Sequence, residues 1–291
     1  MTTRTTSAAR VASQSGMFRI GDERSVARLG FGAMRITGPG IWGPPHDHDE
    51  AIRVLQRAVA LGVTFIDTAD SYGPYISEEL IHEALYPYPD DLVVATKAGL
   101  VRTGPGAWHP LGRPEYLRQE VEMSLRRLQL ERIELLQLHR IDPQVAFEDQ
   151  VGVLADLQRE GKIGHIGLSN VSVEEILAAQ LVATIATVQN RYNLIDRASE
   201  QVLNFCADEG LAFIPWAPIG TDDVSRSHRI ARVAHECGAT PRQIALAWLL
   251  RRSPNMIPIP GTSSVPHLEE NVSAAAVHLT DAQFESLTYR P

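Results

Sequence analysis

The chain has 291 residues, of which 44% are hydrophobic and 21% charged, and this composition excludes a wholly disordered protein. Its 27 basic and 35 acidic residues give a net charge of −8, which argues against broad contact with nucleic acid or anionic lipid. Two cysteines are too few for a disulfide framework, and no apolar run approaches the roughly 18 residues of a membrane span. We therefore expect a cytoplasmic protein, and the length allows either two domains or one α/β barrel.

The first sixteen residues are rich in Thr, Ser, Ala and Arg, and none of them is acidic. They lack the apolar stretch of a secretory signal, although an organelle transit peptide has a similar composition. We predict a disordered tail over residues 1–16, with Met17 as an alternative start, and one folded unit over residues 17–291.

From Phe18 onward, short apolar runs alternate with longer segments whose apolar side chains recur at three- and four-residue spacing. Such alternation is typical of parallel strands joined by crossover helices. Strands are predicted at 27–31, 63–66, 92–95, 133–138, 165–168, 186–188, 212–216 and 256–259. Helices are predicted at 50–61, 114–128, 147–160 and 198–209.

Eight parallel strands are the number that closes into a barrel. The competing open sheet would carry a glycine-rich turn directly after its first strand. Gly38, Gly40 and Gly43 match that spacing, but prolines interrupt the match and no helix is predicted there, so we interpret the segment as a loop. The predicted fold class is α/β, a single (β/α)8 TIM barrel. A hairpin of residues 18–20 and 25–27 around Gly21-Asp22 would close its bottom, and an extra helix would end the chain.

In such a barrel the active site lies at the carboxyl ends of the strands, so polar residues directly after the apolar runs are candidates. Asp67 follows the second run with Tyr72 on the same loop, Lys97 follows the third run, and His139 follows the fourth. An ammonium group stabilises a phenolate, so we expect Lys97 to lower the pKa of Tyr72. Asp67 would keep Lys97 protonated, and His139 would hydrogen-bond a substrate oxygen. Each of these residues, taken alone, could have a purely structural role. Four such residues after successive strands favour an acid–base group that protonates a developing alkoxide.

Five stretches resemble signature sequences of the aldo-keto reductases, in order and without a large gap from about Phe18 to the end of the chain. They are residues 62–73 (GVTFIDTADSYG), 96–97 (TK), 137–139 (QLH), 167–170 (GLSN) and 259–263 (IPGTS). The resemblance implies that Tyr72 is the proton donor, that Lys97 and Asp67 tune it, and that His139 orients the carbonyl.

The same resemblance implies a reduced nicotinamide dinucleotide bound extended across the barrel mouth without a Rossmann turn. Ser169, Asn170 and Gln189 would hold the carboxamide, and Trp216 would stack on the nicotinamide ring. The other cofactor-binding positions that it implies are Gly32, Met34, Ala217, Pro218, Ile219, Gly220, Gly261, Thr262, Ser263, Ser264, His267, Glu270 and Asn271.

The segment expected to bind the adenosine and 2′-phosphate departs from the commonest family pattern, because it lacks the usual lysine and arginine. The hydroxyls of Thr262, Ser263 and Ser264 and the backbone amides at the start of a helix over residues 265–271 would still bind a phosphate. We therefore expect NADPH rather than NADH.

Four residues on predicted loops at the mouth, Trp42, Tyr75, Trp108 and His109, would form an aromatic-walled substrate pocket. These loops, together with residues 139–143, resemble the subgroup that contains bacterial pyridoxal reductases. The expected partner is a small carbonyl substrate, with reduction of pyridoxal to pyridoxine as the specific hypothesis.

Other features of the sequence favour structural roles. The tract of residues 46–50 alternates His with acids, but no separated ligand pair completes a metal site and the acids suit a helix start, so no metal is expected. Cys206 and Cys237 lie among apolar helical neighbours and are expected to pack. Two alternatives stay open, a Schiff-base lyase or aldolase that uses Lys97 and a binding module that senses the redox state of the cofactor.

Overall fold

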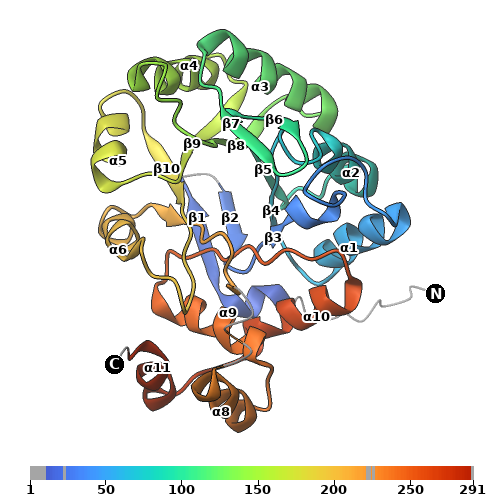
Figure 1. Ribbon diagram of the computed structural model, residues 1–291, viewed down its shortest axis with the longest axis vertical. Coiled ribbons are helices and arrows are strands. Elements are labelled where there is room, and N and C mark those ends of the chain that lie inside the picture. Colours follow the sequence, from blue (N-terminus) through green and yellow to red (C-terminus); the bar gives the residue numbers. More distant parts are fainter. Residues whose placement is uncertain (1–10, 22–23, 221–223, 225–226, 290–291) are drawn as a thin grey trace, which may run out of the picture.

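Parallel strands curl into a closed barrel whose wall follows the order of the strands along the chain. The computed structural model describes residues 11–21, 24–220, 224 and 227–289. Within them the seven neighbouring barrel strands are β3 (Phe31–Gly32), β4 (Phe65–Asp67), β5 (Val93–Ala98), β8 (Ile133–Leu138), β9 (Ile163–Ser169), β10 (Ile185–Gln189) and β11 (Ala212–Phe213). Helices surround them (Figure 1): α1 (His48–Ala60), α2 (Ile76–Leu85), α3 (Pro114–Leu128), α4 (Phe147–Arg159), α5 (Val173–Gln180), α6 (Glu200–Asp208), α9 (Pro241–Arg252) and α10 (Val265–Ser273).

The predicted eighth strand fills the gap between β11 and β3 without forming a regular ladder. The Ile257 N–H donates to the carbonyl of Phe213 at 2.8 Å, and the Gly30 N–H donates to the carbonyl of Pro258 at 2.9 Å. Pro258 and Pro260 have no N–H, so this segment cannot pair continuously. The barrel is nevertheless closed, which confirms the predicted fold class.

Closure also requires two glycines. A Cβ atom on Gly261 would lie 2.5 Å from the carbonyl oxygen of Gly32, and one on Gly32 would lie 2.7 Å from that of Ile259. The first and last segments of the wall therefore approach more closely than any side chain allows. This packing accounts for two glycines that the sequence assigned to the cofactor alone.

The hairpin at the bottom of the barrel is present as predicted. Strands β1 (Met17–Ile20) and β2 (Arg24–Ala27) pair antiparallel, while Asp22 lies outside the described residues. The buried side chains of Ile20 and Val26 belong to the apolar cluster that fills the barrel interior. The single strand predicted at 27–31 is wrong, because β2 ends at Ala27 and residues 28–30 carry the chain from the hairpin to the wall.

The prediction of a disordered tail over residues 1–16 is wrong for residues 11–15. Residues Val11–Ser15 form a 3-10 helix, η1, in which Ala12 and Ser15 are buried. The Ala12 N–H donates to the carbonyl of Leu61, and the Ser15 hydroxyl accepts from the Leu29 N–H. These contacts fix the segment against the barrel, while residues 1–10 lie outside the described residues.

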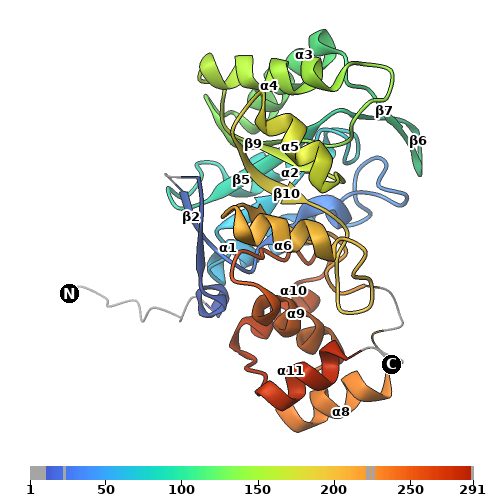
Figure 2. The ribbon, with the colours of Figure 1, turned by 90° about the vertical axis from the view of Figure 1, so that its left-hand side faces the viewer.

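A second hairpin stands where the sequence predicted a loop. Strands β6 (Leu100–Gly104) and β7 (Ala107–Pro110) pair antiparallel around Pro105-Gly106, and Gly106 has a φ of +68° that suits glycine. This hairpin and the β1–β2 hairpin lie at opposite ends of the barrel (Figure 2). It therefore extends from the carboxyl ends of the strands, which we refer to as the mouth.

The chain ends in helices outside the barrel wall. Helices α8 (His228–Cys237) and α11 (Asp281–Thr288) pack against α9 on its outer side (Figures 1 and 2), and the short 3-10 helix η3 (Ala274–Ala276) precedes α11. This arrangement confirms the extra C-terminal helix. None of the helices in the described parts of the chain combines the length and apolar character needed to cross a bilayer.

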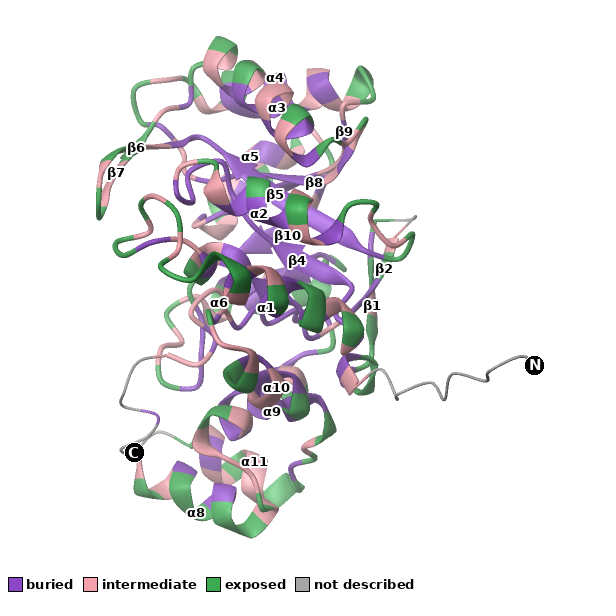
Figure 3. Cartoon of the chain, turned by 90° about the vertical axis from the view of Figure 1, so that its right-hand side faces the viewer, coloured by how far each residue is buried: buried purple, intermediate pink, exposed green. Residues whose placement is uncertain are grey.

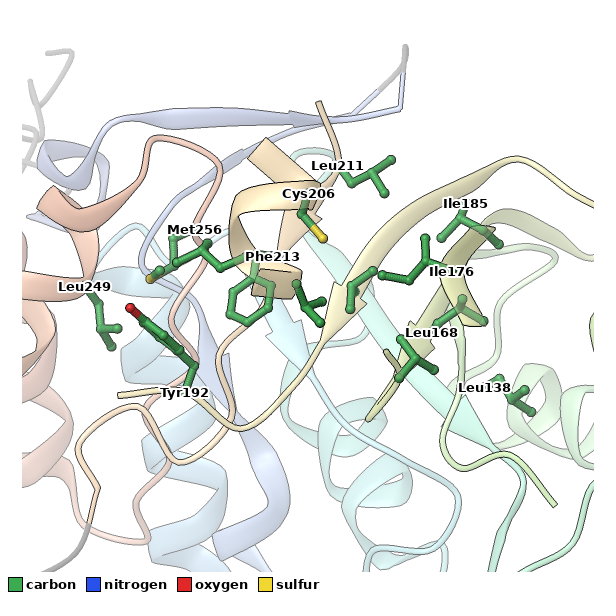
Figure 4. Packing of buried hydrophobic residues seen from close by; sticks show 14 of the residues in the cluster. Leu138, Leu168, Ile176, Ile185, Tyr192, Cys206, Leu211, Phe213, Leu249 and Met256 are labelled. Carbon is green, nitrogen blue, oxygen red and sulfur yellow. The ribbon is translucent and has the colours of Figure 1, made fainter. Parts of the chain in front are cut away.

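The core has one apolar layer inside the barrel and another between strands and helices, so the strands are buried on both faces (Figure 3). Cys206 lies in the outer layer near Leu211 and Phe213 (Figure 4), and burial raises the pKa of its thiol to about 12. Cys237 packs against the same layer. Both cysteines are packing residues, as predicted.

Candidate active site

A buried ion pair lies just inside the mouth. Asp67 ends β4 and Lys97 lies in the adjacent strand β5, and the two side chains are 2% and 0% exposed. The Lys97 Nζ donates to Asp67 Oδ2 at 2.6 Å, to the Thr68 carbonyl at 2.8 Å and to the Tyr72 hydroxyl at 3.3 Å. All three N–H bonds of the ammonium group thus have acceptors, and Lys97 directly contacts both Asp67 and Tyr72.

The second oxygen of Asp67 is held by two amides. Oδ1 accepts from Gln137 Nε2 at 2.9 Å and from Gln189 Nε2 at 2.8 Å. Gly167 makes room for this arrangement, because a Cβ there would lie 2.8 Å from Gln137 Cγ. Gln189, which the sequence assigned to the carboxamide of the cofactor, therefore supports Asp67 through its amide nitrogen.

Gln137 was not predicted as a site residue. It is fully buried in β8, on the side of the strand that Leu135 shares, and His139 continues the same alternation directly after the strand. An amide at an alternate position between an inward apolar residue and a candidate catalytic histidine is the signal that could have identified it.

The charge states of the pair follow from competition between burial and the neighbouring charges. Burial alone would lower the pKa of Lys97, but the Asp67 carboxylate and the Tyr72 hydroxyl outweigh it, so the pKa is raised and Lys97 is protonated. Burial raises the pKa of Tyr72, and the opposing effect of Lys97 is smaller. The expectation that Lys97 brings the pKa of Tyr72 below its usual value is therefore wrong. Tyr72 keeps its proton at neutral pH and is available as a proton donor.

His139 directly follows β8 and faces Tyr72, with the two ring centroids 5.9 Å apart. Burial lowers the pKa of His139 well below its usual value, and the cations of Lys97 and Arg140 lower it further. The imidazole is thus neutral at physiological pH. Its Nδ1 lies 3.3 Å from the Ser71 hydroxyl, and in the tautomer with the proton on Nε2 the serine donates to Nδ1. That tautomer leaves the Nε2–H group to donate to a substrate oxygen.

Three predicted cofactor residues form a hydrogen-bonded chain at the ends of β9 and β11. Asn170 Nδ2 donates to the Ser169 hydroxyl at 2.6 Å, and Trp216 Nε1 donates to Asn170 Oδ1 at 2.9 Å. Asn170 holds this position with a φ of +60°. The indole of Trp216 is therefore fixed in orientation while remaining half-exposed.

The segment Ala217, Pro218, Ile219 and Gly220 continues from this chain. Asn193, which the sequence did not single out, donates to the Ala217 carbonyl at 3.0 Å. Ala217 and Gly220 have φ values of +50° and +79°, so the segment forms a tight turn. This turn lies directly beyond the half-exposed ring of Trp216.

The predicted adenosine segment is partly engaged in its own contacts. Thr262 Oγ1 accepts from the Ser264 N–H at 3.2 Å, and Glu270 accepts from the Thr240 hydroxyl at 2.7 Å. Ser263 and His267 are exposed, whereas Asn271 is buried and its Oδ1 has no hydrogen-bond partner among the described residues. Met34, half-buried after β3, accepts from the Thr37 hydroxyl through its carbonyl.

A carboxylate already occupies the helix start that was expected to bind phosphate. The first N–H of α10, on Val265, donates to Glu50 Oε1 at 2.9 Å, and Arg53 pairs with Oε2 of the same carboxylate. The Val265 N–H and Arg53 lower the pKa of Glu50, so the group is ionised at neutral pH. It places a negative charge where the sequence predicted an anion site.

Only two of the four predicted substrate residues come together. Trp108 approaches Tyr72 edge-on with the centroids 6.5 Å apart, and Trp42 lies on the same side through Arg102, which is near both indoles. Tyr75 instead packs on Arg127 of α3 because its backbone turns with a φ of +71°. His109 is exposed and contacts Thr103 across the hairpin.

The His-rich tract begins helix α1, as its acids suggested. Asp47 caps the helix by accepting from the Glu50 N–H, and His48 pairs with Glu83. Among the residues that the structure describes, no cluster of three His, Cys, Asp or Glu side chains could hold a metal ion.

The sequence matches a known family over most of its length. A family model described as "Aldo/keto reductase family" matches residues 28–289. The chain belongs to the aldo/keto reductase family. The predicted resemblance is thus confirmed, and as a member of this family the chain is an NAD(P)H-dependent oxidoreductase.

Individual relatives agree with this assignment. An uncharacterised oxidoreductase of Schizosaccharomyces pombe is 51% identical over 277 residues, covering 95% of this chain and 90% of the relative. The pyridoxine 4-dehydrogenase of Escherichia coli is 43% identical over 279 residues, covering 94% and 97%. Among solved structures, an aldo-keto reductase from Klebsiella pneumoniae in complex with NADPH has a TM-score of 0.80 at 25% identity, with 93% of each chain covered. The glycerol dehydrogenase of Gluconobacter oxydans has a TM-score of 0.83 at 27% identity, with 94% of each chain covered.

The residues at the mouth of this aldo/keto reductase fit a nicotinamide dinucleotide. Trp216 offers a fixed, half-exposed aromatic face, and the Ser169–Asn170 pair lies beside it. At the other end of the expected path, the buried Asn271 Oδ1 is an acceptor without a partner among the described residues. Both ends thus present groups that a bound dinucleotide would complete.

A buried carboxyl lies on the same loop as Tyr72. Asp70 is 1% exposed, and neither of its oxygens has a partner of good geometry among the described residues. Burial raises the pKa of Asp70 well above its usual value, and the carboxylates of Glu78 and Glu120 raise it further, while Arg127 opposes them. The folded protein therefore holds Asp70 protonated at a pH at which the unfolded chain ionises it, so this residue costs more stability as the pH rises.

We expect Asp70→Asn to raise the melting temperature at pH 8 and to raise it less at pH 5, because the variant has no proton to lose. The melting temperature should rise by about 2–4 °C for each kcal/mol by which the variant increases the free energy of unfolding. Thermal unfolding followed by circular dichroism at both pH values measures the difference. The control is Asp208→Asn at an exposed position of α6. A change in melting temperature for Asp70→Asn that is the same at both pH values would show that Asp70 is ionised in the folded protein.

Proposed function

We propose that this chain reduces an aldehyde or ketone to an alcohol with NADPH as the coenzyme. The observation that carries the proposal is the contact of one buried ammonium, Lys97 Nζ, with both the Asp67 carboxylate and the Tyr72 hydroxyl. Asp67 fixes the charge and position of Lys97, and Lys97 fixes the position of Tyr72. The protonated phenol of Tyr72 therefore lies at the mouth of the barrel in contact with the charged ammonium group of Lys97.

In the proposed reaction the coenzyme supplies a hydride to the carbonyl carbon. The carbonyl π bond breaks as the new C–H bond forms, and its electrons go to the oxygen. His139, neutral and in ring contact with Tyr72, donates a hydrogen bond that orients this oxygen. The Tyr72 hydroxyl transfers its proton to the oxygen, and Lys97 stabilises the resulting phenolate until it regains a proton.

The proposed substrate is a flat aldehyde, with pyridoxal to pyridoxine as the specific case. Support comes from the Trp42 and Trp108 wall beside Tyr72 and from the 43% identity to the pyridoxine 4-dehydrogenase of Escherichia coli. We place this activity in the cytoplasm, with which the free thiols of Cys206 and Cys237 are compatible.

The properties of Lys97 argue against a Schiff-base enzyme. Imine formation requires a neutral amine with a free lone pair. Lys97 is fully buried, its pKa is raised, and its three N–H bonds are engaged. This observation favours the reductase over the lyase or aldolase.

We expect Tyr72→Phe to lower kcat for NADPH-dependent reduction of pyridoxal or a nitrobenzaldehyde by about 100-fold or more, because the proton donor is lost. The dissociation constant of NADPH, measured by fluorescence, should not change. The control is Tyr86→Phe, the same change at an exposed tyrosine after α2. Full activity of Tyr72→Phe would refute the proton-donor role.

The parent protein also distinguishes the competing functions in this assay. Tight NADPH binding without turnover over a broad aldehyde panel would favour a redox-sensing module. Borohydride trapping of a substrate on Lys97 would favour the lyase. Faster turnover with NADH than with NADPH would contradict the proposed coenzyme.

We expect Glu50→Gln to tighten NADPH binding by about three- to tenfold, since it removes a negative charge beside the proposed phosphate site. NADH lacks the 2′-phosphate, so its dissociation constant should change little. Titration of both coenzymes against the parent, Glu50→Gln and the exposed control Glu115→Gln measures this preference. An equal change in the dissociation constants of both coenzymes would show that Glu50 does not determine the preference between them.

A further inference from the structure

Arg102, in strand β6, is the polar centre of the wall beside Tyr72. Each nitrogen of its guanidinium donates to backbone carbonyls. Nε donates to Ala107 at 3.1 Å, Nη1 to Ile41 and to Ser71 at 3.1 Å, and Nη2 to Gly40 at 2.8 Å and Gly104 at 3.3 Å. These five bonds use the whole donor set of an arginine. They join three segments that are far apart in the sequence: the Gly38–Gly43 loop, the loop that carries Tyr72, and the β6–β7 hairpin.

The same guanidinium contacts both indoles of the wall. Its Cζ lies 3.5 Å from the ring centroid of Trp108 and 5.7 Å from that of Trp42, within cation–π distance. Trp108 in turn meets Tyr72 edge-on. Arg102 therefore sets the place of both aromatic side chains relative to the proton donor without touching the donor itself.

Two backbone contacts among the described residues also join these segments. The Gly106 N–H donates to the Gly40 carbonyl at 3.2 Å, and the Trp42 segment pairs with Gly73 through a single bridge. Lysine would keep the charge but offers three donors from one point, so it cannot reach carbonyls on three segments in one plane. The geometry requires arginine.

We propose that Arg102 is a specificity-determining positioning residue, which holds Trp42 and Trp108 as a rigid wall and so selects flat aromatic carbonyl compounds over small aliphatic ones. The inference rests on the proposed function, because it concerns the substrate class of that same site. Arg102 donates to none of the groups that would transfer the proton, and the Asp67–Lys97–Tyr72 contacts form without it. Loss of Arg102 weakens the binding of an aromatic substrate that packs against Trp42 and Trp108. A small aliphatic substrate does not reach these indoles, so its reduction changes little.

The test compares Arg102→Lys and Arg102→Met with the parent on a nitrobenzaldehyde and on propanal, with NADPH. The control is Arg118→Lys, an arginine of α3 that pairs with Glu160 at the surface. We expect KM for the nitrobenzaldehyde to rise about tenfold in both Arg102 variants, while kcat/KM for propanal changes less than about threefold. The ratio of the two kcat/KM values is the readout that general destabilisation would not move. An unchanged ratio, or an equal loss on both substrates, would overturn the proposal.

Hydrogen exchange of the holoenzyme provides a second test of the positioning role, and this test does not depend on turnover. We expect residues 38–43 and 100–110 to exchange faster in Arg102→Lys than in the parent, with β4 and β5 unchanged. Unchanged exchange in those segments would overturn the positioning role even if the kinetics differ. If the parent reduces neither aldehyde, the proposed function fails, and hydrogen exchange still decides whether Arg102 holds the wall.

Discussion

The Lys97–Asp67 ion pair inside the barrel is the interaction on which the rest of the site depends. A buried ion pair is costly unless each donor and acceptor is matched, since both charges lose their hydration. Here the ammonium has three acceptors and the carboxylate accepts from Lys97, Gln137 and Gln189. The partners come from β4, β5, β8 and β10, so the pair is satisfied only when the barrel wall is assembled. Folding and formation of the acid–base device are therefore one event.

The parallel register explains how a largely apolar barrel presents this polar layer. Alternate residues of each strand point inward, so Phe65 and Asp67 share one side of β4, and Leu135 and Gln137 share one side of β8. Phe65 and Leu135 belong to the interior apolar cluster, to which the bottom hairpin also contributes. This cluster excludes water from the lower end of the barrel. The buried charges of Asp67 and Lys97 lie toward the mouth, where the low dielectric strengthens the interactions that hold Tyr72.

The sequence was informative where function follows local position. Polar residues after apolar runs located Asp67, Lys97 and His139, and the boundaries of α3 and β8 match the prediction residue for residue. Contacts between distant segments were not accessible in this way. The carbonyls that Arg102 binds come from two loops and the β6–β7 hairpin, and the glycines and prolines of residues 104–112 conceal that hairpin. The pKa of Tyr72 was misjudged because burial, which outweighs the effect of Lys97, depends on the assembled fold.

The central claim, that Asp67 keeps Lys97 charged, is tested most directly by the pH dependence of single-turnover reduction in Asp67→Asn. In the parent, the raised pKa values of Lys97 and Tyr72 and the lowered pKa of His139 predict a rate that is constant between about pH 7 and 9. Without the carboxylate, only Tyr72 opposes the effect of burial, which lowers the pKa of Lys97, so the rate of the variant should fall as the pH rises through this interval. A profile for Asp67→Asn as flat as that of the parent would contradict the account.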